Sequence, residues 1–381
     1  MQKKILALAV AGHVSSAAFA ESNVSIYGIV DMGYASTSNN VAANATTGAA
    51  ATTSKRKGID SGVLSTSRLG FKGSEDLGGG TSALFVLEYT ILADQNDTIG
   101  TPATQARRAA AGQGWSAARQ QLVGLKGSFG TVVAGRANTL GAAQYNGGSN
   151  AFFGTQLDAH ATISGYARAN TLINAGARAN NALGYISPSF SGVTVGLNYT
   201  LDPLGAEAAT SGDQEKAVIF QVSYENGPMK ASYVNAKLSN TTAVAAVAAP
   251  TNNGKVSASG IAISYDLKVA KIGFSTQNQK DTPATAVGGA PVANPKASSY
   301  QLSVSAPVGS GTVLGQYAKS NPGTAGAQKN NGMAVAYLHP MSKRTTAYAG
   351  YTVANDKNAA GLRRGANIKS KTWGFGIRHN F

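Results

Sequence analysis

The most regular feature of the chain is a period of two between hydrophobic and polar positions. In residues 193–201 every second side chain is hydrophobic, and the positions between them carry Thr, Gly or Asn. The same alternation recurs in 299–306 and in 372–381, where only His379 breaks it. Because successive side chains of a strand point to opposite faces, this pattern predicts β-strands with one apolar and one polar face.

Sixteen strands of this kind can be placed along the chain, and their connections alternate between short and long. We predict strands at 23–37, 61–76, 80–93, 117–128, 130–139, 180–187, 191–202, 216–226, 228–238, 257–266, 269–280, 297–306, 311–320, 330–338, 343–354 and 369–381. The short connections are rich in Gly, Pro, Asn or Asp, as tight turns require. The long connections are rich in Ala, Thr, Asn and Gly, and examples are 38–60, 94–116, 239–256 and 281–296.

Alternation alone fits a soluble β-sandwich as well as a membrane barrel, and the connection lengths separate the two. An up-and-down barrel in the outer membrane has short turns at one end and long loops at the other, which a sandwich does not. An even strand number lets the last strand pair with the first, so that no strand edge is left unpaired in lipid. Four tyrosines that each precede a short turn fit an aromatic girdle, namely Tyr185, Tyr224, Tyr265 and Tyr337. The predicted fold is therefore all-β, a 16-stranded antiparallel transmembrane β-barrel with long extracellular loops and short periplasmic turns.

One connection, from about residue 140 to 179, is longer than the others. It contains aromatic side chains such as Phe152 and Tyr166, which disordered segments usually lack. A disordered, solvated flap is the alternative to a folded loop. Because a 16-stranded barrel is too wide for its wall side chains to fill, we expect this third long loop to fold into the interior and narrow it.

The first twenty residues have the pattern of a cleaved signal peptide. Lys3 and Lys4 precede a short apolar run, and Ala18-Phe19-Ala20 offers a cleavage site before Glu21. We therefore expect a signal peptide at 1–20 and a single barrel domain at 21–381. No later run of 18 or more apolar residues predicts a membrane-spanning helix.

The composition fits an exported barrel with an excess of positive charge. The chain has no cysteine, so it has no disulfide framework. Of its 32 basic residues, 30 remain after Lys3 and Lys4 are removed, against 17 acidic ones, which leaves a formal charge of +13. The basic residues are scattered rather than gathered on one helix or patch, which argues against a nucleic-acid partner.

Several motifs resemble the general (diffusion) porins of Gram-negative bacteria, in particular those of the β-proteobacterial type. They are the segment 67–78 (SRLGFKGSEDLG), the segment 119–127 (RQQLVGLKG) with Phe129-Gly130 and Gly135-Arg136, the segment 178–181 (RANN), the segment 185–192 (YISPSFSG) and the terminal Phe381. The resemblance spans essentially the whole predicted barrel, apart from the extracellular loops. It implies a homotrimer in the cell outer membrane in which each barrel forms a pore that its third loop constricts.

The resemblance also implies a set of constriction residues. Basic side chains on the wall would face acidic or polar groups on the third loop, and Arg68, Arg119, Arg136 and Arg178 match the wall positions. Glu88 and Asp158 are our candidates for the counter-charges, and Lys72 is a further basic candidate on the strand of Arg68. Arg68 and Lys72 share the face opposite Leu69 and Phe71, so the strand pattern also turns them inward. Arg119 has the parity of the lipid-facing positions and needs a β-bulge to face inward. For Arg136, a contact with lipid headgroups is the alternative.

These expectations predict a water-filled channel for passive diffusion of small hydrophilic solutes and ions, with a preference for anions. A substrate-specific channel for phosphate, a sugar or an organic anion is the main alternative. An enzyme is not expected, because the few histidines have no evident catalytic or metal-binding partners, and no cofactor or metal is predicted. A β-solenoid adhesin is disfavoured because the loop lengths vary too much for a fixed repeat. The expected partners are further copies of the chain, outer-membrane lipid and lipopolysaccharide, and small solutes.

Overall fold

The fold is seen in a computed structural model, which describes residues 23–43, 50–94, 118–140, 147–164, 178–201, 216–241, 254–282, 296–321, 329–356 and 368–381. Almost every regular element in these ranges is a strand. The strands are β1 (Asn23–Val41), β2 (Thr52–Ser61), β3 (Arg68–Gly78), β4 (Thr81–Thr90), β5 (Ala118–Gly127), β6 (Gly130–Asn138), β7 (Arg178–Ile186), β8 (Val193–Leu201), β9 (Lys216–Asn226), β10 (Met229–Thr241), β11 (Gly254–Asp266), β12 (Lys271–Thr282), β13 (Lys296–Val308), β14 (Gly311–Asn321), β15 (Asn330–Pro340), β16 (Thr345–Asp356) and β17 (Ile368–Asn380). Two short helices, α2 (Gly147–Ser149) and α3 (Ala159–Ser164), lie between β6 and β7.

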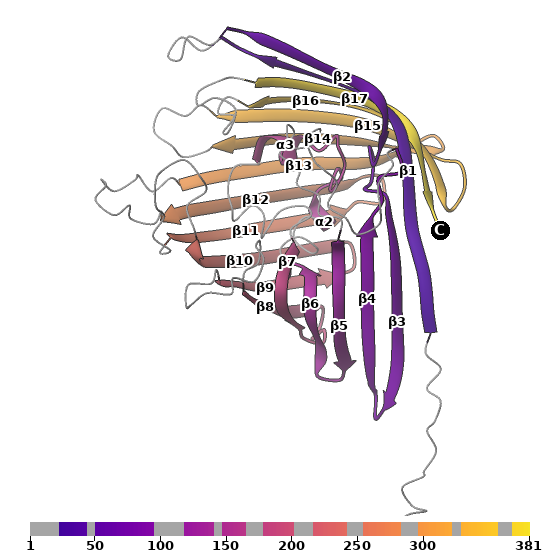
Figure 1. Ribbon diagram of the computed structural model, residues 1–381, viewed down its shortest axis with the longest axis vertical. Helices are drawn as coiled ribbons and strands as arrows, with labels where there is room; N and C mark the ends of the chain where they lie inside the picture. The colour runs from indigo at the N-terminus through magenta and orange to yellow at the C-terminus, as the bar shows by residue number, and fades with distance from the viewer. Residues whose placement is uncertain are drawn as a thin grey trace, which may run out of the picture.

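The strands form one closed antiparallel barrel (Figure 1). From β3 onward each strand pairs with the next, and β17 pairs with β1 over thirteen residue pairs, from Ile29 with Asn380 to Val41 with Ile368. The last residue completes the seam, since Phe381 N donates to Gly28 O and Gly28 N donates to Phe381 O, each at 3.1 Å. The prediction that the last strand closes on the first is confirmed.

Seventeen strands in the described residues occupy sixteen positions of the barrel, because β2 and β3 share one. β2 pairs with the second half of β1, and β3 pairs with its first half. The predicted long connection 38–60 is therefore wrong in part, and the single predicted strand 61–76 is interrupted at 62–67. The periodicity missed β2 because backbone pairing above the lipid band requires no apolar side chain, and Lys55-Arg56-Lys57 is compatible with it.

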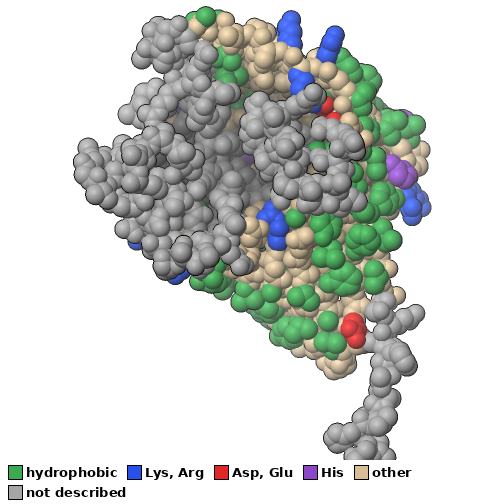
Figure 2. Space-filling model, viewed as in Figure 1, with side chains coloured by type: hydrophobic (Ala, Val, Ile, Leu, Met, Phe, Trp, Pro, Cys, Tyr) green, Lys and Arg blue, Asp and Glu red, His purple; other side chains and the backbone are tan. Residues whose placement is uncertain are grey.

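The outer surface of the barrel is apolar and the inner surface is mostly polar. Exposed Val218, Phe220 and Leu302 point outward, whereas the alternate residues Gln221 and Gln301 are buried inside. Figure 2 shows hydrophobic side chains spread over the outer face of the strands on one side. No helix in the described part of the chain is long and apolar enough to cross a membrane. The outward alternation predicted from the sequence is confirmed, and it suits an outer face that contacts lipid.

The short connections and the tyrosine girdle also lie where the sequence predicted them. The turns after β3, β5, β9, β13 and β15 each join two paired strands. Tyr185, Tyr265 and Tyr337 are exposed and Tyr224 is half-buried, each a few residues before a short connection. The Tyr185 hydroxyl donates to Phe129 O at 2.8 Å.

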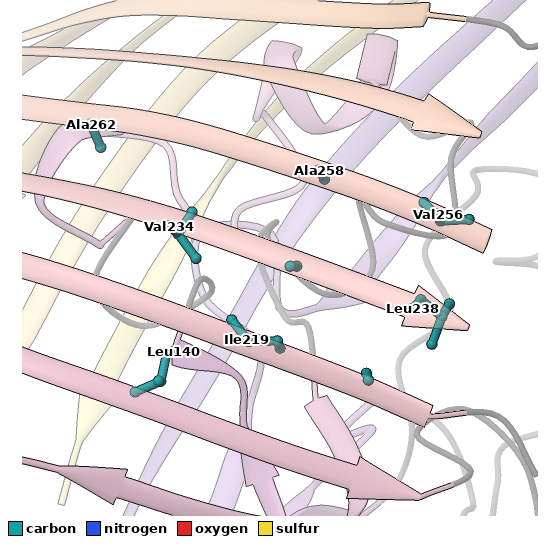
Figure 3. Packing of buried hydrophobic residues seen from close by; sticks show 9 residues of the cluster. Leu140, Ile219, Val234, Leu238, Val256, Ala258 and Ala262 are labelled. Atoms are coloured by element: carbon teal, nitrogen blue, oxygen red, sulfur yellow. The ribbon is translucent and has the colours of Figure 1, made fainter. Parts of the chain in front are cut away.

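Part of the inner wall is apolar rather than polar. Inward side chains of β9, β10 and β11 form a buried cluster with Leu140, which follows β6 (Figure 3). Leu140 N donates to Asn198 Oδ1 at 2.9 Å, and a Cβ added at Gly196 would overlap the Leu140 side chain. The long connection after β6 therefore begins against the inner wall.

The described part of that long connection, residues 147–164, lies inside the barrel, as Figure 1 shows for α2 and α3. Polar wall residues bind its backbone, since Gln301 Nε2 and Ser303 Oγ donate to Ser149 O at 2.9 and 2.7 Å. Further along, Ser320 Oγ donates to Ile163 O at 2.9 Å. This part of the loop is fastened to β11 to β16 along its length.

Apolar contacts add to these hydrogen bonds. Phe152, Leu157 and Ile163 are fully buried. Wall glycines make room for the loop, because a Cβ at Gly350 would overlap Leu157 and one at Gly273 would overlap Ser149 O. The expectation that the third loop folds inward is thus met by the residues described, which include Phe152 but not Tyr166.

Candidate functional site

The candidate site is a cluster of arginines around one carboxylate on the inner wall of β3 to β7. Arg119 Nε donates to Glu88 Oε1 at 2.5 Å, and both side chains are buried. Arg68 and Arg178 lie within electrostatic range of this pair and of each other. Four of the seven residues predicted from the sequence are therefore gathered in one place.

A β-bulge turns Arg119 inward. Glu88 pairs with Gln120 and the next residue, Tyr89, pairs with Ala118, so Arg119 is an extra residue opposite the β4 ladder. This irregularity supplies the bulge that an inward pose of Arg119 requires. One Arg119 nitrogen, Nη1, is buried and has no hydrogen-bond partner among the described residues.

Tyr27 joins the cluster from β1. Its hydroxyl donates to Glu88 Oε2 at 3.1 Å, so Glu88 is held from both sides. The Tyr27 ring lies over Gly70, where a Cβ would overlap it, and Lys72 Nζ lies 5.2 Å from the ring centroid. Lys72 is therefore on the inner wall, as its parity predicted, four residues closer to the short-turn end than Arg68.

The interruption between β2 and β3 positions Arg68, and Asp31 holds that interruption in place. The buried Asp31 carboxylate accepts hydrogen bonds from Leu64 N at 2.8 Å, from Ser65 N and from the Tyr348 hydroxyl at 2.5 Å. Arg68 Nε then donates to Thr66 O at 3.0 Å. We did not identify Asp31 from the sequence, because a single aspartate in a strand gives no signal of its own.

Arg378 is a further basic residue of the site that the sequence analysis missed. It pairs directly with Asp31 across β1 and β17, and its Nη1 donates to Ser65 Oγ at 3.3 Å. The positive charge of Arg378 also lies within electrostatic range of Arg68 and repels its guanidinium group. The strand pattern could have found it, because Arg378 alternates with the outward-facing Phe375 and Ile377.

Arg136 lies at the edge of the cluster. Its Nε donates to Ala118 O at 2.9 Å and its Nη1 to Asn180 Oδ1, which ties β6 to the ends of β5 and β7. It is within electrostatic range of Arg178, but the structure records no contact between Arg136 and Glu88. A register irregularity next to Arg136 accompanies this placement.

Asp158 is not brought to the arginine cluster. It is only 1% exposed and faces β14, where it accepts hydrogen bonds from Gln316 Nε2 at 3.0 Å and Asn150 Nδ2 at 2.9 Å. It also caps α3 through the backbone N–H groups of His160 and Ala161. Burial raises the pKa of the Asp158 carboxyl and lowers the pKa of the adjacent His160 imidazole. The geometry gives Asp158 a place in the attachment of the loop.

The chemistry available at the site is electrostatic. Guanidinium groups stay charged and present several donors to anions. Among the described residues there is no group of three or more His, Cys, Asp or Glu side chains that could hold a metal ion. The arrangement can attract and orient anions in the barrel interior.

Comparison with known proteins gives one consistent family. A family profile described as Gram-negative porin matches residues 7–359. Outer membrane porin protein 32 of Delftia acidovorans is 31% identical over 95% of this chain and 92% of its own length. An outer membrane porin protein of Bordetella pertussis is 30% identical over the whole of both chains. Among solved structures, an anion-selective porin from Comamonas acidovorans superposes with a TM-score of 0.68 at 29% identity, covering 95% of this chain and 100% of that one.

Proposed function

The chain belongs to the family of Gram-negative porins and forms a channel in the outer membrane, and from this premise we propose that its inner arginine cluster makes the channel prefer anions. The observation that carries the proposal is the excess of positive charge on one part of the wall. Arg68, Arg119 and Arg178 surround one carboxylate, that of Glu88. The similarity to a porin described as anion-selective supports the same preference.

The physical basis is the field inside a narrow opening. Charged side chains that line a pore select ions by sign, because the low-dielectric wall focuses their field on the path of the ion. The negative charge of Glu88 neutralises part of this field. Tyr27 and Arg119 hold the Glu88 carboxylate in place through hydrogen bonds. We assign Lys72 and Arg136 to positions beside the arginine cluster, where their charges add to the positive field along the path of the ion. For Asp158 we propose an anchoring role in the third loop instead of the counter-charge expected from the sequence.

The test is the reversal potential of the refolded protein in a planar bilayer under a salt gradient. A unit charge about 7 Å from an ion in water contributes roughly 0.6 kcal/mol, and 0.1 M salt screens about half of that. Replacing Arg68 and Arg178 by Ala should therefore lower the anion-to-cation permeability ratio several-fold. Arg344→Ala, in the exposed turn before β16, removes a charge far from the cluster and should leave the ratio unchanged. A wild-type channel that favours cations would overturn the proposal.

A substrate-specific channel is the second candidate, because the gathered guanidinium groups offer several hydrogen-bond donors to one preferred anion. Such a channel would show a conductance that saturates with that solute. General diffusion predicts conductance that rises in proportion to salt and no solute that blocks it at low concentration.

The remaining assignments rest on the family. We infer that the chain assembles as a homotrimer, contacts outer-membrane lipid and lipopolysaccharide, and catalyses no reaction. We also infer that a signal peptide is removed after Ala20, which lies outside the described residues. Cross-linking of the refolded protein and N-terminal sequencing of the exported chain would test the assembly and the cleavage.

A further inference from the structure

A row of lysines runs around the outside of the barrel at the long-loop end of β9 to β13. One lysine from each strand takes part, and we call the set the lysine cluster: Lys216, Lys237, Lys255, Lys280 and Lys296. All five side chains are exposed. The channel function described above uses none of them.

Strand register brings these lysines side by side. Lys280 pairs directly with Lys296, and Ser257 pairs with both Lys237 and Lys280. One step further toward the loops, Ser239 pairs with both Lys216 and Lys255. Since neighbouring strands lie about 4.8 Å apart, the ammonium groups are spaced by roughly 5 to 10 Å along the outer surface.

The cluster lies directly above the apolar band of the outer surface. Lys216 has the parity of the exposed Val218 and Phe220, and Lys296 has that of the exposed Tyr300 and Leu302. No described outward-facing side chain of β9 to β13 is acidic. The five charges therefore repel one another, and Lys280 opposite Lys296 is an unfavourable cross-strand pair.

We propose that the lysine cluster binds the phosphorylated headgroup of a lipid in the outer leaflet. Lysine ammonium groups are compact charges that bind phosphate, and several of them spaced by 5 to 10 Å suit a headgroup that carries more than one phosphate. The exposed apolar residues below the cluster would contact the acyl chains of the same molecule. The lysine cluster and the apolar residues below it form one continuous surface, which favours a lipid over a free anion because a free anion would make no contact with the apolar residues.

The proposal deepens the lipid contact inferred above by naming the site and the headgroup chemistry. It also gives the facing lysines Lys280 and Lys296 a counter-charge, which no described outward-facing side chain of β9 to β13 supplies. It depends on the orientation of the barrel in the membrane but not on ion selectivity.

The test is binding of a diphosphorylated glycolipid to the full chain refolded in uncharged detergent. The fivefold variant Lys216→Gln, Lys237→Gln, Lys255→Gln, Lys280→Gln and Lys296→Gln should bind this glycolipid at least about tenfold more weakly than the wild type. A control variant with Lys230→Gln, Lys268→Gln and Lys343→Gln removes three lysines at the short-turn end and should bind as the wild type does. Equal affinity of the fivefold and control variants would overturn the proposal.

Two further arms identify the source of the phosphate and guard against misfolding. The dephosphorylated glycolipid should bind no better to the wild type than to the fivefold variant. Inorganic pyrophosphate should compete only weakly with the glycolipid, and strong competition would indicate a free-anion site and refute the lipid.

The double variant Lys280→Gln and Lys296→Gln should be at least as heat-stable as the wild type without lipid, because it removes a repulsion. It should gain less stability than the wild type when lipid is added. A double variant that gains as much as the wild type contradicts the proposal. All variants should keep the wild-type reversal potential, so the outcome does not depend on anion selectivity.

Discussion

The attachment of the third loop to the inner wall should depend strongly on Leu157. This side chain is fully buried, and it packs against the wall where Gly350 leaves space for it. Replacing a buried leucine by alanine costs about 2 to 5 kcal/mol, because transfer free energy is lost and a cavity remains. The hydrogen bonds of the loop to the wall stay in place in the variant, so the loss falls on the packing contact alone. We take about 3 kcal/mol, which corresponds to a rise of roughly a hundredfold in the population of the detached loop.

A single cysteine can report this detachment, because the chain contains none. Ile163 lies in the same loop and is fully buried, so a cysteine introduced there reacts with a thiol reagent only when the loop leaves the wall. In the Ile163→Cys background, Leu157→Ala should raise the labelling rate roughly a hundredfold. Leu302→Ala makes the same chemical change on the lipid-facing side and should leave the rate unchanged.

The neighbouring glycine provides a second, reciprocal test of the contact. Gly350→Ala should itself speed labelling, because its Cβ would overlap Leu157. Combined with Leu157→Ala it should add less, since the overlap with Leu157 is then gone and only the contacts with Ala336 and Val335 remain. A double-mutant cycle measures this coupling. A labelling rate within twofold of the reference in Leu157→Ala would refute the view that apolar packing holds the loop.

Three further predictions concern the barrel wall. Asp31→Ala leaves two backbone N–H groups and a phenol without their acceptor, at about 1 to 3 kcal/mol each, so the denaturant midpoint should fall markedly. Asp76→Ala, at the exposed end of β3, frees only one N–H group that water can bind, and it should lower the midpoint far less. Glu88→Gln should raise the anion-to-cation permeability ratio roughly two- to threefold, opposite in sign to loss of an arginine, and an unchanged reversal potential would contradict the electrostatic interpretation. Gly28→Ala places a methyl group against the C-terminal ring and should reduce the yield of folded barrel on unheated gels, whereas Gly58→Ala, which has open space, should not.

The sequence by itself determined that the chain forms a barrel with an apolar outer face and a mostly polar inner face. Alternation with a period of two needs only the strand geometry, and the segregation of short and long connections needs only the two ends of a barrel. These two patterns were enough to predict the strand positions, the closure through the last strand and the inward face of Arg68. They did not detect β2, because a strand that pairs beyond the lipid band needs no alternation of apolar and polar side chains.

Only the tertiary structure decided which side chains meet. The parity of Arg119 pointed outward, and a bulge against β4 turns it toward Glu88. Asp158 was expected among the constriction charges, yet the fold places it against β14, because a buried carboxylate needs the donors that Gln316 and the start of α3 supply. Register, bulges and loop attachment join residues far apart along the chain, and a local pattern of hydrophobic and polar positions carries no information about such contacts.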